Sequence, residues 1–317
     1  MTDHNFLNDL EAFVTADSLF SPAIGQFDEN ELVSDIPFEL FRFDSPIAVV
    51  TTVGVPNGYV LQDTMLDVLL GEADASLASG QASQPFRPDF VISPTLTFSG
   101  ILEVAEKRNA QMLVVASEEE ILGSLSLENL LWRRGMLLLR ELGRELGQVT
   151  LELCTFHSTS FYTLPQGRQQ KAKDDFRMKG QARWDALRDV AEPRGKRADA
   201  DCMRRELIQC TTFRDKKTML FKSELGLKTD RRTIVRTFNF FERIRKYCER
   251  PQATYTHDCH AASVLEGACH EKITPDDRMP IFVSIPIHKT LRIKNISDLA
   301  RAVRDCKELI ADISAAV

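Results

Sequence analysis

The chain has 317 residues, of which 43% are hydrophobic and 27% are charged, and its formal net charge is −6. This length allows two domains with sizeable cores, and the composition is ordinary for a globular protein. No apolar run is long enough to span a bilayer, and the N-terminus has no basic start followed by an apolar block. We therefore expect a cytoplasmic protein with no secretory signal and no membrane segment.

The first half of the chain contains one pattern twice: a helix, a strand, a turn, a second strand and a second helix. In the first copy, Phe27–Phe41 is predicted as a helix interrupted by Pro37, and Pro46–Val53 as a buried strand. VPNG is a turn of the kind that joins two strands, GYVL is the second strand, and QDTMLDVLL is a helix that ends at Gly71. The Ala-, Ser- and Gly-rich segment Gly71–Pro88 is predicted as a linker between the copies.

The second copy shows the same order more clearly. Thr95–Ala110 has helical spacing of its apolar residues, and Met112–Ser117 is a buried-strand run. A turn of glutamates leads to a second short strand, Ile121–Ser126. A helix is then predicted from Leu127 to about Leu146, with its leucines along one stripe that packs on another element.

The second half of the chain is predicted to be mainly helical. Val149–Leu164, rich in β-branched and aromatic residues, is expected to be a strand, and a polar basic stretch follows it. Glycine and proline nearly vanish after Asp201. The segment RRTIVRTFNFFERIRKYCER is a helix with its apolar residues on one face and most of its arginines elsewhere. A last helix spans Ile296–Ile313, capped by Asn295 or Ser297.

Charge is distributed unevenly along the chain. Residues 166–250 hold 24 Lys and Arg against 13 Asp and Glu, a net +11, while the remaining residues carry −17. Such a basic segment can mark an anionic partner. It can also reflect attraction to the acidic half of the same chain, or helices with a solvated basic face. The sequence leaves these readings open.

A short motif stands where the second strand of the second copy passes into a helix. Gly123 leads the strand, and Ser126 and Asn129 follow at its end, three residues apart. A serine or asparagine at such a joint most often caps the helix by accepting hydrogen bonds from free N–H groups. Two polar groups directed at one spot beside apolar strand ends also suit a ribose diol, with an adenine between aliphatic side chains.

This second copy resembles the cystathionine β-synthase (CBS) domain, which normally occurs in tandem. Gly123–Asn129, with the sequence GSLSLEN, is similar to that family's Gly-x-apolar-Ser/Thr-x-x-Asp/Asn ribose-binding signature. The resemblance implies that Ser126 and Asn129 bind the ribose of an adenine nucleotide. It also implies that Ile92 and Met112 line the adenine.

The resemblance covers roughly residues 20–147 and implies two small α/β units related by a pseudo-two-fold axis. The first copy departs from the signature, with Leu61 in place of the hydroxyl and Thr64 in place of the acid. Leucine cannot hydrogen-bond a ribose, so at most one nucleotide per chain is expected. Asn129 is neutral where the family commonly has Asp, and a CBS fold that only dimerises is a second interpretation.

The segment 175–317 resembles the HEPN helical bundle, which occurs in RNA-cleaving toxins and in nucleotide-associated regulators. Active members use an Arg and a His four residues apart, the His as acid/base and the Arg to stabilise the phosphorane charge. Arg245 and Arg250 precede His257 at other spacings, and Pro251 intervenes. We therefore expect a non-catalytic bundle, with Arg250 and His257 as outside candidates for catalysis.

Cysteine and histidine gather in the stretch HDCHAASVLEGACH, which holds His257, Cys259, His260, Cys269 and His270. These are ligands that zinc prefers, but structural sites usually place them two to four residues apart rather than adjacent. Seven cysteines scattered through a long chain suit reduced thiols in a cytosol. We expect free cysteines and no zinc here, with Cys259, His260, Cys269 and His270 as outside candidates for a metal.

These observations define the predicted architecture. We expect an α/β N-terminal CBS pair (a Bateman-type module) at 1–147, with copies at about 20–71 and 88–135. A connector at 148–174 leads to a basic, mainly α-helical domain at 175–317. CBS pairs usually dimerise through their helices, so a homodimer is expected.

The predicted function is that of a cytoplasmic regulator. The CBS pair would sense an adenine nucleotide of the AMP or ATP class, and the helical domain would pass the response to a partner. Two alternatives remain: a nucleic-acid-binding or protein-binding module that uses 166–250, and a metal-independent RNase of HEPN type. No phosphate-binding Gly-rich loop, nucleophile elbow or paired-carboxylate pattern indicates an enzyme.

Overall fold

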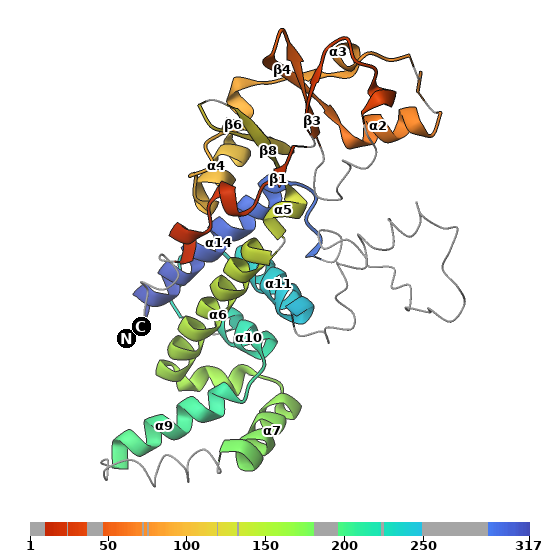
Figure 1. Cartoon of the computed structure of the whole chain (residues 1–317). Coiled ribbons are helices and arrows are strands. Elements are labelled where there is room, and N and C mark those ends of the chain that lie inside the picture. Colours follow the sequence, from red (N-terminus) through yellow and green to blue (C-terminus); the bar gives the residue numbers. More distant parts are fainter. Residues whose placement is uncertain are drawn as a thin grey trace, which may run out of the picture. The chain divides into compact units, whose positions relative to one another are not determined.

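The computed structural model describes residues 10–23, 25–36, 47–71, 73–74, 76–118, 120–131, 133–180, 196–222, 225–248 and 291–317. Its described residues form two compact units (Figure 1). The first contains the residues up to 138 and 291–301, and the second contains 139–248 and 302–317. Two long helices, α6 (Arg133–Phe156) and α14 (Ile296–Ala315), contribute residues to both units.

The first unit contains two four-stranded sheets of one topology. In each, a short strand runs parallel to a central strand, a third strand pairs antiparallel with the central one, and a two-residue strand completes the edge. The first sheet has the order β2 (Gln26–Asp28), β3 (Ile47–Thr52), β4 (Val55–Leu61), β5 (Gln84–Pro85). The second has the order β6 (Val91–Ile92), β7 (Met112–Ala116), β8 (Ile121–Ser126), β1 (Ser21–Pro22).

The edge strands are exchanged between the two copies. β1 directly precedes β2 in the chain but pairs with β8, with Ser21 opposite Ser124. β5 directly precedes β6 but pairs with β4. Two isolated β-bridges, Thr15 with Thr97 and Leu32 with Ala78, join the segment before each edge strand to the same copy as that strand. Each sheet is therefore completed by the segment that leads into the other copy.

Along the sequence, the helices of this unit occupy corresponding positions between the strands of the two copies. Thr97 accepts a hydrogen bond from the Gly100 N–H at the start of α4, and Asn109 ends that helix in the left-handed conformation. In the first copy, the buried core joins β3 and β4 to α2 through Val50, Val60 and Met65. The helices are α2 (Gln62–Leu69), α3 (Ser79–Ala82), α4 (Phe98–Arg108) and α5 (Leu127–Leu131).

Three details of this unit differ from the sequence predictions. The helix predicted at Phe27–Phe41 is wrong at its start, because Phe27 lies in β2 and pairs with Val50. A 3₁₀ helix follows at Val33–Asp35. Residues 37–41 of the predicted helix lie outside the described part of the chain. The hairpin turn is at Val53–Gly54 rather than VPNG, because both residues have positive φ (54° and 77°), as two-residue hairpin turns require. The predicted linker contains α3 and β5.

The second unit is helical. Its elements are α6 from residue 139 on, 3₁₀ helix η5 (Ser158–Thr163), α7 (Gln166–Asp175), π-helical η6 (Phe176–Gly180), α9 (Lys196–Gln209), α10 (Phe213–Lys222), α11 (Arg231–Cys248) and α14 from residue 302 on. Figure 1 shows α10 and α11 beside α6. Gly143 of α6 permits this packing, because a Cβ there would lie 2.8 Å from the Phe241 ring of α11.

The strand predicted at Val149–Leu164 is wrong, since α6 continues to Phe156 and a 3₁₀ helix follows. The apolar stripe of α6 simply continues through buried Val149 and Leu153, and burial of a continuous stripe outweighs β propensity. Thr150 donates its hydroxyl to the Leu146 carbonyl one turn earlier, which accommodates a β-branched residue in the helix. The single helix predicted from Leu127 is instead two helices, α5 and α6.

Asp312 of α14 secures the loop that enters α11. Its carboxylate accepts hydrogen bonds from the N–H groups of Lys228 and Thr229 and from the Thr229 hydroxyl. Burial alone would raise the pKa of Asp312, but these hydrogen bonds outweigh it and hold the pKa below its ordinary value of 3.8. The charged carboxylate is therefore the form that stabilises the fold.

Asp312→Asn is expected to lower the free energy of unfolding by about 1 kcal/mol at neutral pH, because a neutral amide accepts these bonds less strongly. Since the folded-state pKa is depressed, this contribution is complete above 3.8 and is lost as pH falls through the lower folded-state pKa. Urea unfolding at a series of pH values measures the difference. Glu308→Gln, on the exposed side of the same helix, is the control; equal effects of the two variants would contradict the assignment.

Within the part of the chain that the structure describes, no helix combines the length and the apolar character needed to cross a membrane.

Candidate functional site

The joint between β8 and α5 is held by a local hydrogen-bonded pair. Ser126 is the last residue of β8, and α5 begins at Leu127. The Asn129 Oδ1 atom accepts hydrogen bonds from both the backbone N–H and the hydroxyl of Ser126, each at 2.8 Å. The three-residue spacing brings the asparagine of the first helical turn back over the serine, so that a free N–H at the helix start is satisfied.

The same asparagine also binds an edge strand from far away in the sequence. Its Nδ2 atom donates a hydrogen bond of 2.6 Å to the hydroxyl of Ser21 in β1. Ser21 is 3% exposed, so this bond lies in a largely dry environment. Asn129 thus connects the strand–helix joint to the segment that enters from before the first copy.

Gly123 makes the approach of β1 possible. A Cβ at this position would lie 2.0 Å from the Ser21 carbonyl oxygen and 2.9 Å from the Pro22 Cα, distances that no side chain tolerates. Gly123 pairs with Pro22 on one side and with Val115 of β7 on the other. Its role in the structure is therefore close backbone packing.

The two predicted adenine-lining residues occupy different rows of the sheet. Met112 pairs directly with Ser126 and is half-buried, so it lies beside the polar joint. Ile92 pairs with Val115, in the row that contains Gly123, and is 5% exposed. Three residues of strand separate the rows, about 10 Å. The structure therefore brings Ser126, Asn129 and Met112 together and places Ile92 and Gly123 farther along the sheet.

The joint retains capacity for a ligand. The Ser126 oxygen donates one hydrogen bond and still carries lone pairs, and the Asn129 amide has a second N–H beyond the one bound to Ser21. Both residues are half-buried. One acceptor and one donor side by side match the two hydroxyls of a ribose.

The first copy has no such pair. Leu61 ends β4 and precedes α2 as Ser126 precedes α5, and it makes no side-chain cap hydrogen bond. Thr64, three residues on, stands where Asn129 stands in the second copy. The hydrogen-bonded pair of Ser126 and Asn129 thus stands at one of the two matching joints.

The remaining sequence candidates belong to the segment that follows α11 in the sequence. Arg250, His257, Cys259, His260, Cys269 and His270 lie outside the described residues. Among the residues that are described, no group of three or more His, Cys, Asp or Glu side chains is arranged to hold a metal ion, and Cys154 and Cys306 are buried free cysteines. Burial raises the pKa of Cys154 to about 12, so that thiol is protonated at neutral pH.

The sequence interpretation missed two features of the described structure that bear on candidate sites. Ser21 had no signal, because its contact with Asn129 spans 108 residues. Four arginines of α11 line a groove with Phe221 of α10. The sequence did place most of these arginines off the apolar face of the helix, but nothing in it indicated the phenylalanine beside them.

Comparison with known proteins gives limited similarity. No protein-family model matches the chain, and no curated protein matches its sequence. The CBS domain of a bacterial CNNM/CorC family Mg2+ transporter in complex with ATP is 16% identical, with a TM-score of 0.30, over 40% of this chain and 90% of that one. A hemolysin-like protein containing a CBS domain, from Oenococcus oeni PSU, is 13% identical, with a TM-score of 0.27, over 38% of this chain and 85% of that one.

Hypoxic Response Protein I, with two coordinated zinc ions, is also similar, at 16% identity and a TM-score of 0.27, over 37% of this chain and 97% of that one. Solved structures that resemble part of the chain thus include CBS-domain proteins. TM-scores this low do not assign a fold, and the α/β architecture described above follows from the strand order and pairing of the chain itself.

Proposed function

We propose that the chain is a cytoplasmic regulatory protein whose two α/β copies form a CBS-type pair that binds one adenine nucleotide. One observation carries this proposal: the hydrogen-bonded Ser126–Asn129 pair at the strand–helix joint, present in one of two copies of equal topology. The second copy would bind the ribose, with Met112 against the base, and the first copy would serve as a structural partner.

Binding would act on the structure through Asn129. A ribose oxygen that accepts the second amide hydrogen of Asn129 would hold this side chain in the orientation that binds Ser21 of β1. A ligand shifts an equilibrium only as far as its affinities for the two states differ. The two conformational states would be one with β1 paired to β8 and one with β1 released, and the nucleotide would bind them with different affinities. The helical part of the chain would pass this conformational change to a partner. We further propose that the protein is a homodimer, which analytical ultracentrifugation tests.

Isothermal titration with AMP, ATP, S-adenosylmethionine and cyclic di-AMP in turn tests the proposal. Saturable binding near one site per chain is expected for an adenine nucleotide. Ser126→Ala combined with Asn129→Ala should weaken that binding roughly tenfold to a hundredfold, because two ribose hydrogen bonds are lost.

Thr64→Ala is the matched control, since it changes the equivalent position of the copy that lacks the pair; its affinity should equal that of the wild type. The double variant also loses three hydrogen bonds of its own, at about 1 kcal/mol each, so its folding must be checked by circular dichroism. Unchanged affinity in a folded double variant would refute the site. No binding of any of the four ligands would leave the pair as a dimerisation scaffold.

Nuclease activity of HEPN type, through Arg250 and His257, stays a prediction, because both residues lie outside the described part of the chain.

A further inference from the structure

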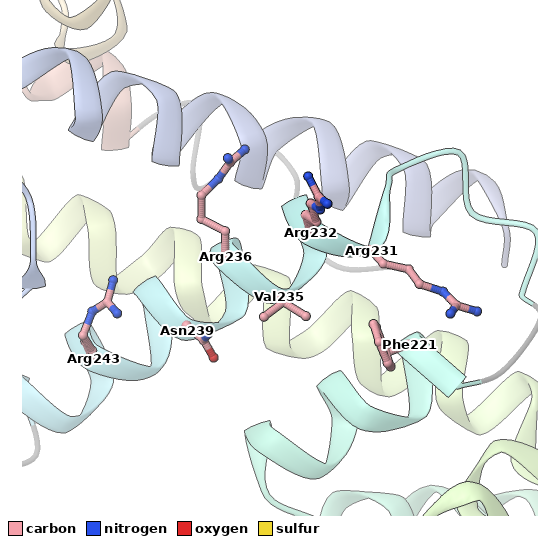
Figure 2. Close-up of a pocket in the computed structure, with 7 residues that line it drawn as sticks. All are labelled: Phe221, Arg231, Arg232, Val235, Arg236, Asn239 and Arg243. Carbon is pink, nitrogen blue, oxygen red and sulfur yellow. The ribbon is translucent and has the colours of Figure 1, made fainter.

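Four arginines are spaced along one side of α11, of which Arg231, Arg232 and Arg236 are exposed and Arg243 is half-buried. Arg231, Arg232, Arg236 and Arg243 line a groove of about 610 Å3 together with Asn239 of the same helix and Phe221 of α10. Figure 2 shows Arg232, Arg236 and Arg243 pointing to one side of α11, with Arg231 extending from the start of the helix past the Phe221 ring. The opposite face of the helix is the buried one, with Ile234, Phe238 and Phe241. We call these four arginines, Asn239 and Phe221 the arginine groove.

The positive charge of the groove is only partly compensated. The Nε and Nη2 atoms of Arg236 donate to one carboxylate oxygen of Asp305, at 3.0 and 2.6 Å, which fixes this guanidinium while its side chain stays 52% exposed. Among the described residues, Arg231 and Arg232 form no ion pair, and both are exposed. The groove therefore presents a net positive charge to an incoming ligand.

The length of the row favours a chain of phosphates over a single one. Arg231 and Arg243 are twelve residues apart in one helix, so the row is about 18 Å long. Successive phosphates of one strand are about 3.4 Å apart along the axis of a double helix and farther apart in an unstacked strand, so the row can face several successive phosphates. One isolated phosphate group would engage only one or two of these guanidinium groups.

Phe221 adds a surface for a base. Its ring is half-buried and lines the groove; the Arg231 guanidinium lies over it, 5.1 Å from the ring centroid, but Arg231 is exposed and would move to a phosphate as a base takes its place on the ring. An aromatic ring beside a row of cations is how proteins bind single strands, because the unpaired bases can stack on the ring while the phosphates pair with the cations. A double helix offers no free base face, and an acidic peptide offers no ring to stack.

We propose that the arginine groove binds single-stranded nucleic acid, with the phosphates along Arg231, Arg232, Arg236 and Arg243 and one base against Phe221. This binding is independent of the nucleotide site at Ser126 and Asn129. RNA and DNA both supply the phosphates and bases that the arginine groove would bind, and the experiment below distinguishes between them.

Fluorescence anisotropy of the full chain with labelled oligo(U) RNA and oligo(dT) DNA, each about ten nucleotides long, measures the binding. Saturable binding that weakens with added salt is expected. Arg231→Gln with Arg232→Gln should lower the affinity roughly tenfold and reduce the slope of log K against log salt by about 1.4, the value for two lost phosphate contacts on a single strand. The oligonucleotide that binds with the higher affinity identifies whether the natural ligand is RNA or DNA.

Arg168→Gln with Lys171→Gln is the matched control, because it removes the same charge from exposed positions of α7. If this control and the α11 variant weaken binding equally, the effect is one of net charge and the proposal fails. Phe221→Leu separates stacking from charge: it should weaken oligonucleotide binding about tenfold and leave inorganic polyphosphate binding unchanged. Equal binding of poly-glutamate and oligonucleotide, or no oligonucleotide binding at low salt, would overturn the proposal.

Discussion

Gly123→Ala is expected to lower the free energy of unfolding by about 1–3 kcal/mol, as overpacking of a well-packed interior does. The added Cβ would lie 2.0 Å from the Ser21 carbonyl oxygen, a backbone atom that cannot turn away. The edge strand β1 must therefore move off β8, and the bond from Asn129 to Ser21 breaks with it. Urea unfolding of the variant measures the loss.

Gly167→Ala is the control for this substitution, because a Cβ at that position of α7 meets nothing within 4 Å. It should leave stability unchanged or raise it by about 0.5–1 kcal/mol, as alanine does in a helix. The combination of Gly123→Ala with Ser21→Ala gives a sharper test. If β1 has already detached, the second change costs nothing more, and fully additive costs would contradict the mechanism.

Phe238→Ala is expected to cost about 3–5 kcal/mol, the largest effect of a single substitution that we expect in the helical unit. Phe238 is 1% exposed, and its ring packs against Phe213 with the centroids 4.6 Å apart. It lies on the buried side of the helix whose exposed side carries the arginine groove. Removing the ring leaves a cavity between α10 and α11, and unfolding followed by far-UV circular dichroism reports the loss.

Phe156→Ala supplies the comparison, because Phe156 at the end of α6 is 66% exposed and its truncation should change stability by less than about 0.5 kcal/mol. Phe238→Leu should fall between the two, since it keeps part of the buried volume. Equal destabilisation by Phe238→Ala and Phe156→Ala would show that Phe238 does not anchor α11.

The sequence predicts best those elements whose own residues decide their structure. The interior strands β3, β7 and β8 each contain at least three consecutive buried residues, and they lie where the sequence places them. The edge strands β1 and β5 have two residues each, too few for any periodicity, and only their partners define them. Val149–Leu164 was misread because β-branched residues suggested a strand, whereas the continuing apolar stripe favoured a helix.

The candidate site likewise combines contacts between residues close in sequence, which the sequence predicts, with contacts between remote residues, which it does not. The pair of Ser126 and Asn129 is local, and its spacing alone predicts that the two side chains meet. The partner of that pair, Ser21, is remote in sequence and appears only once β1 is seen to join β8. The arginine groove combines both cases, since the arginine spacing is local to α11 and Phe221 comes from another helix.

The exchange of edge strands has a consequence for how the first unit can be divided. A fragment that begins after β2 lacks β1, and its second sheet would expose an unpaired edge along β8. A fragment that ends before β5 leaves β4 equally open. Open strand edges recruit other chains, so either half expressed alone is expected to aggregate or to pair with a second molecule. We therefore expect the two copies to unfold as one cooperative unit rather than as independent domains.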